Sequence, residues 1–156
     1  RVLTNTNFRL SLNQMKRDIA ALLRAHGIQP SAQRLAVGAY VLDTGDHPSA
    51  DEVWRRAQAN LPMISRATVY NTLHLLVKKG LVRELVLAEG RSVFDCNCGA
   101  HHHFIDEATG SIHDVPWDAV RVSRVERLAG YDVKEYMVVM RGTRSRARAA
   151  RHKRRG

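Results

Sequence analysis

The sequence lacks any apolar run long enough to cross a membrane, and residues 1–7 lack the apolar core of a secretory leader. It has only two cysteines, Cys96 and Cys98, which are too close together for an ordinary structural disulfide and too few for a four-thiolate zinc site. These absences argue against a membrane protein and against a disulfide-stabilised secreted domain. We therefore expect a soluble cytoplasmic protein.

Acidic side chains are absent from the end of the chain. Residues 141–156 contain eight Lys and Arg, and without them the formal net charge of the chain falls from +10 to +2. A segment of this composition cannot bury a core, so we expect a basic, disordered tail that a polyanion such as nucleic acid would attract. The alternative is a solubilising end with no binding role.

Helix signals fill the first half of the chain. Apolar residues recur at helical spacing over residues 12–23, and Gly27 ends that pattern. Three serines stand at expected N-cap positions, one before each of three further helices: Ser31, Ser49 and Ser65. Glu52 lies three residues after Ser49 and completes a capping box. We therefore expect four helices before Gly80, the last of them over residues 66–79.

A β-hairpin is predicted after these helices, with strands over residues 81–87 and 91–94. Helices followed by such a hairpin indicate a winged helix-turn-helix, in which the fourth helix enters the DNA major groove. Its apolar positions Val69, Leu73 and Leu76 would face the core. The side chains expected to contact DNA come from the first and fourth helices: Lys16, Arg24, Arg66, Thr68, Tyr70 and Asn71.

The second half predicts a small α/β domain. A hairpin is expected over residues 105–114, a helix over residues 117–129 and a strand over residues 133–140. Because this unit is small, a homodimer would bury its apolar face. The predicted class is α+β, divided into a DNA-binding domain (1–94), a metal-binding and dimerisation domain (95–140) and a basic tail (141–156).

Histidines and carboxylates gather around residue 100. His101 and His103 are two apart, so on a strand they share one face, whereas His102 points to the other face. Asp95 and Asp114 end neighbouring segments whose carboxylates can converge on that pair. Imidazole and carboxylate without thiolate suit Fe(II), Mn(II) or Zn(II). The alternative is a solvated histidine patch without a metal.

The whole pattern resembles the ferric uptake regulator family of bacterial metal-dependent repressors. Residues 65–73 resemble the recognition helix of that family, and residues 47–51 resemble the segment that carries its first metal ligand. The resemblance implies a homodimer that binds a palindromic, AT-rich operator. It also implies one regulatory metal site with these ligands: His47, Asp95, His101, His103 and Asp114.

Within the family, the sequence is most similar to the iron response regulator branch, because of the triplet His101-His102-His103 and the stretch 130–139. That branch makes the triplet a possible haem site, although the cysteine-proline haem motif is missing. The peroxide-sensing branch comes next, because aspartate stands at both Asp95 and Asp114. Paired Cys-x-x-Cys motifs are absent, so no structural zinc held by four cysteines is expected. Arg121 and Glu135 replace two ligands of an additional family site.

The expected function is therefore a metal-dependent transcriptional regulator of iron homeostasis or oxidative-stress genes, and not an enzyme. A metal held between the two domains would fix the dimer for operator binding. One alternative is a metal-independent, basic nucleoid-type protein, which would leave the five ligands without a role. Another is a metalloenzyme, but the sequence has no HExxH or His-x-Glu…Pro-Cys-x-x-Cys pattern.

Overall fold

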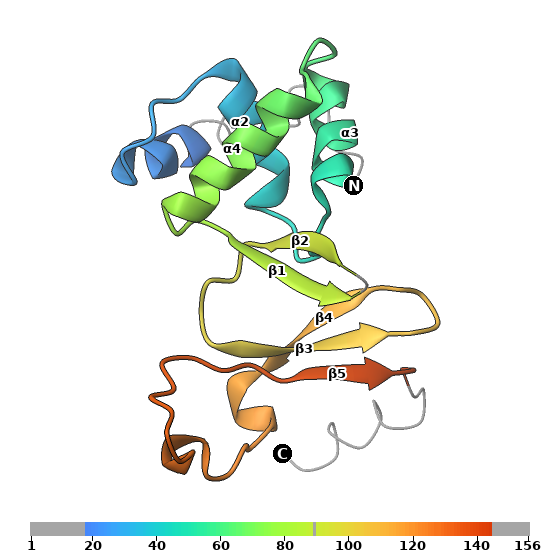
Figure 1. Ribbon diagram of the computed structural model, residues 1–156. Helices are drawn as coiled ribbons and strands as arrows, with labels where there is room; N and C mark the ends of the chain where they lie inside the picture. The colour runs from blue at the N-terminus through green and yellow to red at the C-terminus, as the bar shows by residue number, and fades with distance from the viewer. Residues whose placement is uncertain (1–17, 89, 145–156) are drawn as a thin grey trace, which may run out of the picture. The chain divides into compact units, whose positions relative to one another are not determined.

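The computed structural model describes residues 18–88 and 90–144. Two compact units divide the chain between Cys98 and Gly99. The first unit contains helices and a hairpin, and the second contains a three-stranded sheet (Figure 1). This succession confirms the predicted α+β class. Within the described ranges, no helix has both the length and the apolar character that a membrane span requires.

The helices of the first unit begin and end at the predicted signals. Residues 18–25 are helical, and Gly27 terminates this helix with a φ of 69°. The three helices that follow are α2 (Ala32–Val41), α3 (Ala50–Asn60) and α4 (Arg66–Lys78). The side chains of their N-cap serines each accept a hydrogen bond from the backbone N–H three residues later. All three predicted caps are therefore confirmed.

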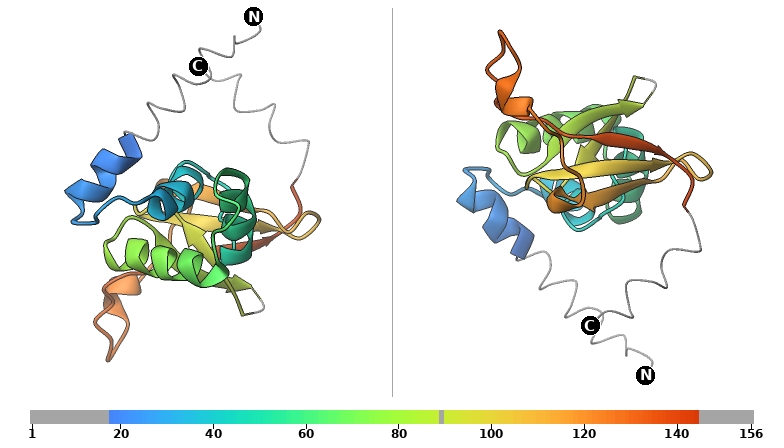
Figure 2. Two further views of the ribbon diagram at one scale, coloured as in Figure 1. Left: turned by 90° about the horizontal axis from the view of Figure 1, so that it is seen from above. Right: turned by 90° about the horizontal axis from the view of Figure 1, so that it is seen from below.

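One apolar core holds the helices of this unit together. Val69, Leu73 and Leu76 of α4 are completely buried in it, as the helical spacing predicted. Leu23 contributes from the helix that precedes α2, and Phe94 contributes from the hairpin. Figure 2 shows α2, α3 and α4 lying against one another. Packing of one face of α4 leaves its other face on the surface of the unit.

The hairpin consists of β1 (Arg83–Ala88) and β2 (Arg91–Asp95), which pair antiparallel. Phe94 anchors it to the helices, because its side chain is buried in the core and its N–H donates to the carbonyl of Pro48 at 2.9 Å. The segment between α2 and α3 is thus joined directly to the end of β2. Asp95, the last residue of β2, follows directly after this bond and is paired with Arg83 of β1.

The second unit is built on the strands β3 (His101–Asp106), β4 (Ile112–Pro116) and β5 (Val139–Gly142). Their order is β4-β3-β5, with β3 antiparallel to β4 and parallel to β5. Residues 117–138, which we call the crossover, join β4 on one side of β3 to β5 on the other side. The strand that carries the histidine triplet is therefore the central one.

The helix predicted over residues 117–129 is wrong. The crossover contains only two short 3-10 turns, η1 (Trp117–Ala119) and η2 (Val125–Arg127), and Arg124 between them is left-handed with a φ of 67°. The segment is rich in valine, whose branched side chain disfavours helix. Val122 and Leu128 also remain exposed, so no packing offsets the cost of ordering a helix.

Candidate metal centre and DNA-reading helix

Three potential ligands converge in the second unit. His101 and His103 are on one face of β3, and Asp114 is paired with His103 across the ladder to β4. The Nε2 atoms of the two imidazoles are 2.9 Å apart, and Nε2 of His101 is 3.7 Å from Oδ1 of Asp114. Both histidines are buried. The structure therefore brings together three of the predicted ligands, two by alternation along β3 and the third by pairing with β4.

The geometry of this set suits a divalent metal. Two nitrogens that each lie about 2.1 Å from one metal, at a right angle, are about 3.0 Å apart, close to the observed separation. Nδ1 of His101 lies 2.9 Å from the carbonyl oxygen of Gly99, which can accept its proton. That hydrogen bond would leave the lone pair on Nε2, where a metal needs it.

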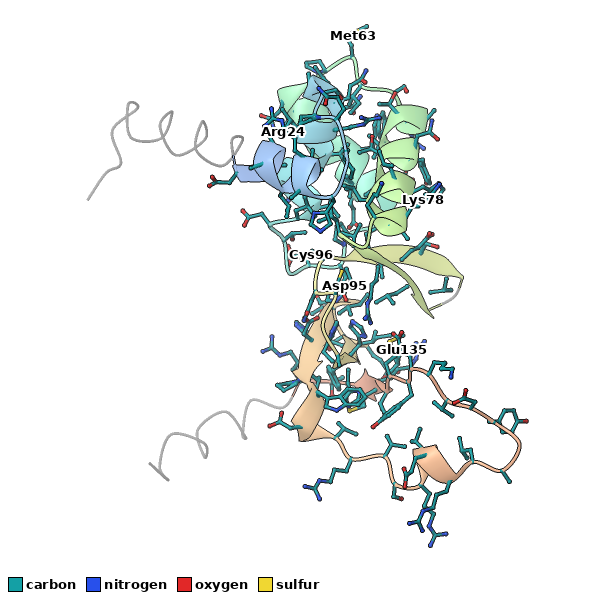
Figure 3. The ribbon with its side chains drawn as sticks, turned by 90° about the vertical axis from the view of Figure 1, so that its left-hand side faces the viewer. Arg24, Met63, Lys78, Asp95, Cys96 and Glu135 are labelled. Atoms are coloured by element: carbon teal, nitrogen blue, oxygen red, sulfur yellow. The ribbon has the colours of Figure 1, made fainter. Side chains whose placement is uncertain are left out.

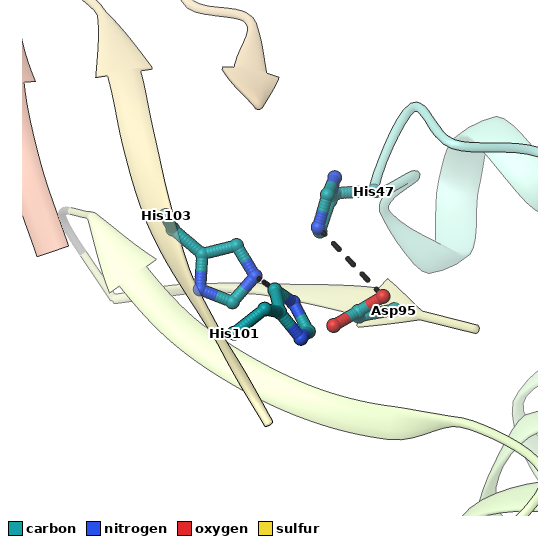
Figure 4. A group of neighbouring side chains, drawn as sticks. All are labelled: His47, Asp95, His101 and His103. Atoms are coloured by element: carbon teal, nitrogen blue, oxygen red, sulfur yellow. Dashed lines mark hydrogen bonds and ion pairs between the residues drawn. The ribbon is translucent and has the colours of Figure 1, made fainter. Parts of the chain in front are cut away.

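The first unit contributes a second pair. His47 lies between α2 and α3 and Asp95 ends β2, and Nε2 of His47 is 3.8 Å from Oδ1 of Asp95 (Figure 4). Both side chains are buried. His47 has a φ of 48°, an uncommon conformation for a residue other than glycine. Asp95 also accepts the N–H of Asn97 at 2.7 Å.

The two cysteines bind backbone carbonyls. Sγ of Cys96 donates to the carbonyl of Thr44 at 3.1 Å, and Sγ of Cys98 donates to that of Gly80 at 3.4 Å. Arg83 also donates to the carbonyl of Cys98 at 2.8 Å. The segment after Asp95 is thus attached to the turns that follow α2 and α4; Cys96 and Asp95 are labelled in Figure 3. Sequence reasoning missed this role, because thiol-to-carbonyl bonds have no spacing rule.

The fourth helix presents a mixed surface to solvent. Tyr70 is 41% exposed and Asn71 is exposed, whereas Thr68 is half-buried and its hydroxyl lies 2.9 Å from that of Ser65. Tyr70 and Asn71 therefore remain available to a ligand. The hydroxyl of Thr68 instead contacts Ser65, the N-cap residue of α4.

Arg66 is held by the neighbouring helix α3. Its Nη1 lies 3.3 Å from Oδ1 of Asp51, and its guanidinium carbon lies 4.3 Å from the centre of the Trp54 ring. Trp54 also donates its indole N–H to the carbonyl of Ile64, just before α4, at 3.0 Å. These contacts orient both Arg66 and the start of the helix, and no sequence pattern had indicated them.

Basic residues predicted to contact DNA also occur on the first helix. Arg24 is exposed there and is labelled with Lys78 of α4 in Figure 3. Lys16 lies outside the described residues, as does residue 145 onward of the basic tail.

Comparisons with known proteins agree on one family. The family model described as the ferric uptake regulator family matches residues 25–141. The peroxide-responsive repressor PerR of Staphylococcus aureus (strain Mu50) is 36% identical over 117 residues, covering 75% of this chain and 77% of that protein. The stretch matched by the family model therefore includes every proposed metal ligand.

Solved structures show the same fold. The Vibrio cholerae ferric uptake regulator aligns with a TM-score of 0.64 at 24% identity, covering 80% of this chain and 98% of that chain. The Pseudomonas aeruginosa ferric uptake regulator with manganese aligns with a TM-score of 0.57 at 23% identity, covering 81% and 97%. Both likenesses extend across nearly the whole of the solved chains.

Proposed function

Because the chain belongs to the ferric uptake regulator family of metal-responsive, DNA-binding transcriptional regulators, we propose that it is a repressor whose operator affinity depends on a bound divalent metal. The proposed ligands of one metal per subunit are His47, Asp95, His101, His103 and Asp114. The family consists of regulators and not enzymes, so the metalloenzyme alternative is set aside. The observation that carries the proposal is the convergence of the His101 and His103 Nε2 atoms at 2.9 Å.

The donor set favours Fe(II) or Mn(II) as the physiological metal. Three imidazoles and two carboxylates provide nitrogen and oxygen without thiolate, which suits these ions and also permits Zn(II) in a purified protein. The pair His47 and Asp95 belongs to the DNA-binding unit, and the other three ligands belong to the unit that we propose forms the homodimer. A metal shared by both sets would fix the separation of the two recognition helices and thereby link metal affinity to operator affinity.

The first test removes one ligand. His101→Ala should lose the bound metal and the metal-dependent gain in DNA affinity while remaining folded, because β3 keeps its ladder bonds on both sides. Metal content after dialysis and operator affinity with and without chelator measure these effects. His113→Ala, on the opposite face of the adjacent strand β4, is the matched control and should behave as wild type. Full metal content and a retained metal response in His101→Ala would contradict the assignment.

We further propose that α4 reads the operator. Asn71 can form two hydrogen bonds with adenine, and the ring of Tyr70 can pack on a thymine methyl. Arg66, oriented by Asp51 and Trp54, would contact a phosphate, with support from Arg24 and Lys16. Thr68 would contribute through its partly exposed face.

Tyr70→Ala and Asn71→Ala should each lose about 1–3 kcal/mol of discrimination between operator and unrelated DNA. Competition binding of the two duplexes at fixed salt measures this quantity. His74→Ala, an exposed position on the same helix, should keep the preference. If both Tyr70 and Asn71 variants retained the wild-type preference, α4 would not be the reader.

The physiological signal to which the regulator responds can be tested with the same operator-binding assay. The similarity to a peroxide-responsive repressor supports a role in oxidative stress, and the resemblance to the iron response branch supports iron homeostasis. Operator affinity should be measured in parallel with Fe(II), Mn(II), haem, and Fe(II) plus peroxide. Loss of binding after peroxide with Fe(II), but not with Mn(II), would indicate peroxide sensing, whereas a response to haem would make His101, His102 and His103 its candidate ligands.

A further inference from the structure

His102 lies between two proposed metal ligands but on the other face of β3. Successive side chains of a strand alternate, so His102 is on the face opposite to that of His101 and His103. It is completely buried, with an exposed fraction of 0%. The triplet therefore divides into two ligands on one face and a single buried imidazole on the other.

The first contact of this imidazole is with the end of the crossover. Nδ1 of His102 accepts a hydrogen bond from the N–H of Val138 at 3.2 Å. The next residue of the strand, His103, donates its own N–H to the carbonyl of Val138 at 3.0 Å. Both backbone groups of Val138 are therefore bound by adjacent residues of the strand that carries the ligands.

The second contact reaches the start of the crossover. The ring of His102 stacks on that of Trp117, with centroids 4.6 Å apart and planes inclined by 30°. The ring of Tyr136 lies 4.7 Å from Trp117 and 6.3 Å from His102, so the three rings form one cluster. His102 thus contacts both ends of the crossover, whose middle around η2 extends away from the strands in both views of Figure 2.

The crossover buries little of its surface. No residue from 117 to 138 is fully buried. Several of its apolar side chains are exposed to solvent: Trp117, Val122, Leu128, Tyr131 and Met137. A segment with so little buried surface opens easily, and its order depends on the contacts at its ends.

We propose that His102 is a positioning residue, which couples metal binding by His101 and His103 to the order of the crossover through Val138 and Trp117. The inference rests on the metal site of the proposed function. A bound metal would restrain the side chains of His101 and His103, and the reverse face of the same strand holds the crossover. Since coupling is reciprocal, loss of the His102 contacts should also weaken metal binding.

The expected loss of metal affinity can be judged from residues that orient metal ligands in other metalloproteins. Loss of such a partner commonly weakens metal binding by about tenfold or more. His102→Phe keeps a planar ring against Trp117 but removes the acceptor for Val138. His102→Asn keeps an acceptor but removes the ring. Both variants should bind metal about tenfold more weakly than wild type, with His102→Ala weaker than either.

Co(II) titration of the full-length protein tests this proposal. The positions of the visible Co(II) absorption bands and the number of ions bound per subunit should be the same in wild type and in His102→Asn, because the ligands are unchanged. Only the affinity should fall. His113→Phe, which lies on the same sheet face but opposite Phe104, is the control and should keep wild-type affinity.

Amide hydrogen exchange tests the coupling in the wild-type protein, and variants then serve for comparison. Metal should slow exchange of the Val138 amide in the wild type, by a factor similar to the loss of affinity in His102→Ala. The slowing should disappear in His102→Phe. If a variant fails to fold, the wild-type measurement still tests the coupling.

Three results would overturn the proposal. Unchanged affinity and unchanged Val138 exchange would show that His102 is not coupled to the metal. Altered Co(II) bands or a lost equivalent of metal in His102→Asn would make His102 a ligand. An equal loss of affinity in His113→Phe would indicate general destabilisation. A wild-type protein that binds no Co(II) would instead refute the metal site itself, and this would be seen before any variant is compared.

Discussion

At the scale of single residues, the thiol of Cys98 shows how local environment affects reactivity. Burial raises the pKa of Cys98, and the carboxylate of Asp95 acts in the same direction, against the opposing effect of Arg83. Since only the thiolate is nucleophilic, a raised pKa makes this thiol less reactive near neutral pH. Cys98 therefore behaves as a structural residue that donates to Gly80.

The rate of alkylation measures the reactivity of the Cys98 thiol directly. Cys98 should react with iodoacetamide more slowly in the native protein than in urea at neutral pH, and its native rate should rise only at a pH above that at which the unfolded thiol becomes reactive. Mass spectrometry of the peptide that contains Cys98 gives both rates. Equal rates in the two states would show that burial does not protect the thiol.

The candidate site was only partly predictable from residues. The shared face of His101 and His103 follows from the period of a strand, and the structure agrees. The left-handed backbone of His47 does not follow from any local pattern. The next residue, Pro48, is bound by Phe94, which is far from it in the sequence. Long-range contacts of this kind are not encoded in spacing.

At the scale of elements, the capping box of α3 links sequence to stability. Ser49 and Glu52 exchange hydrogen bonds: Oγ of Ser49 accepts the N–H of Glu52 at 3.3 Å, and the N–H of Ser49 donates to Oε2 of Glu52 at 2.7 Å. The hydrogen bonds from the Ser49 side chain and backbone lower the pKa of Glu52. A lowered pKa means that the folded state favours the ionised carboxylate.

Ser49→Ala should reduce the free energy of unfolding by about 1 kcal/mol at neutral pH. Because the folded pKa of Glu52 is depressed, its stabilisation is present above the unfolded pKa and is lost as pH falls through the folded pKa. The difference between wild type and Glu52→Gln should therefore shrink in acid, as urea denaturation at several pH values would show. Ser31→Ala removes a cap that has Arg34 where α3 has Glu52. Its effect on the free energy of unfolding should therefore not vary with pH over this range. A Glu52→Gln difference that stayed constant with pH would contradict the argument.

The elements differ in how well they could be predicted. Each N-cap depends on a hydrogen bond between a serine side chain and the backbone N–H three residues later. The structure confirms all three predicted caps: Ser31, Ser49 and Ser65. The helix expected over residues 117–129 is wrong because apolar spacing indicates a helix only where a partner surface buries it. Leu128 is 51% exposed, so that surface is missing from this unit.

At the scale of the whole molecule, charge is concentrated at one end. The basic tail carries eight of the Lys and Arg, and β5 ends at Gly142, so removal of the residues beyond it leaves the sheet complete. Phosphate contacts release counterions and make binding depend on salt. We expect the tail to add affinity for DNA of any sequence and to take no part in metal sensing.

Truncation after Gly142 should weaken binding to operator and unrelated duplexes by a similar factor, and the slope of log affinity against log salt should become shallower. The gain in affinity on adding Mn(II) should survive. Salt titrations of both duplexes, with and without metal, measure these effects. If truncation removed specific binding and left non-specific affinity unchanged, the tail would be reading sequence, as arginines in a minor groove can.

The central position of β3 has a kinetic consequence. Ladders to β4 on one side and β5 on the other hold this strand, and central strands are among the last parts of a fold to open. His101 and His103 therefore stay assembled while edges and connections fluctuate. An ion held there as we propose would leave by breaking its ligand bonds one after another, and not by fraying of the strand. The lifetime of the metal-bound state would then be set by the chemistry of ligand exchange, which differs between ions, and the duration of repression should depend on which metal is bound.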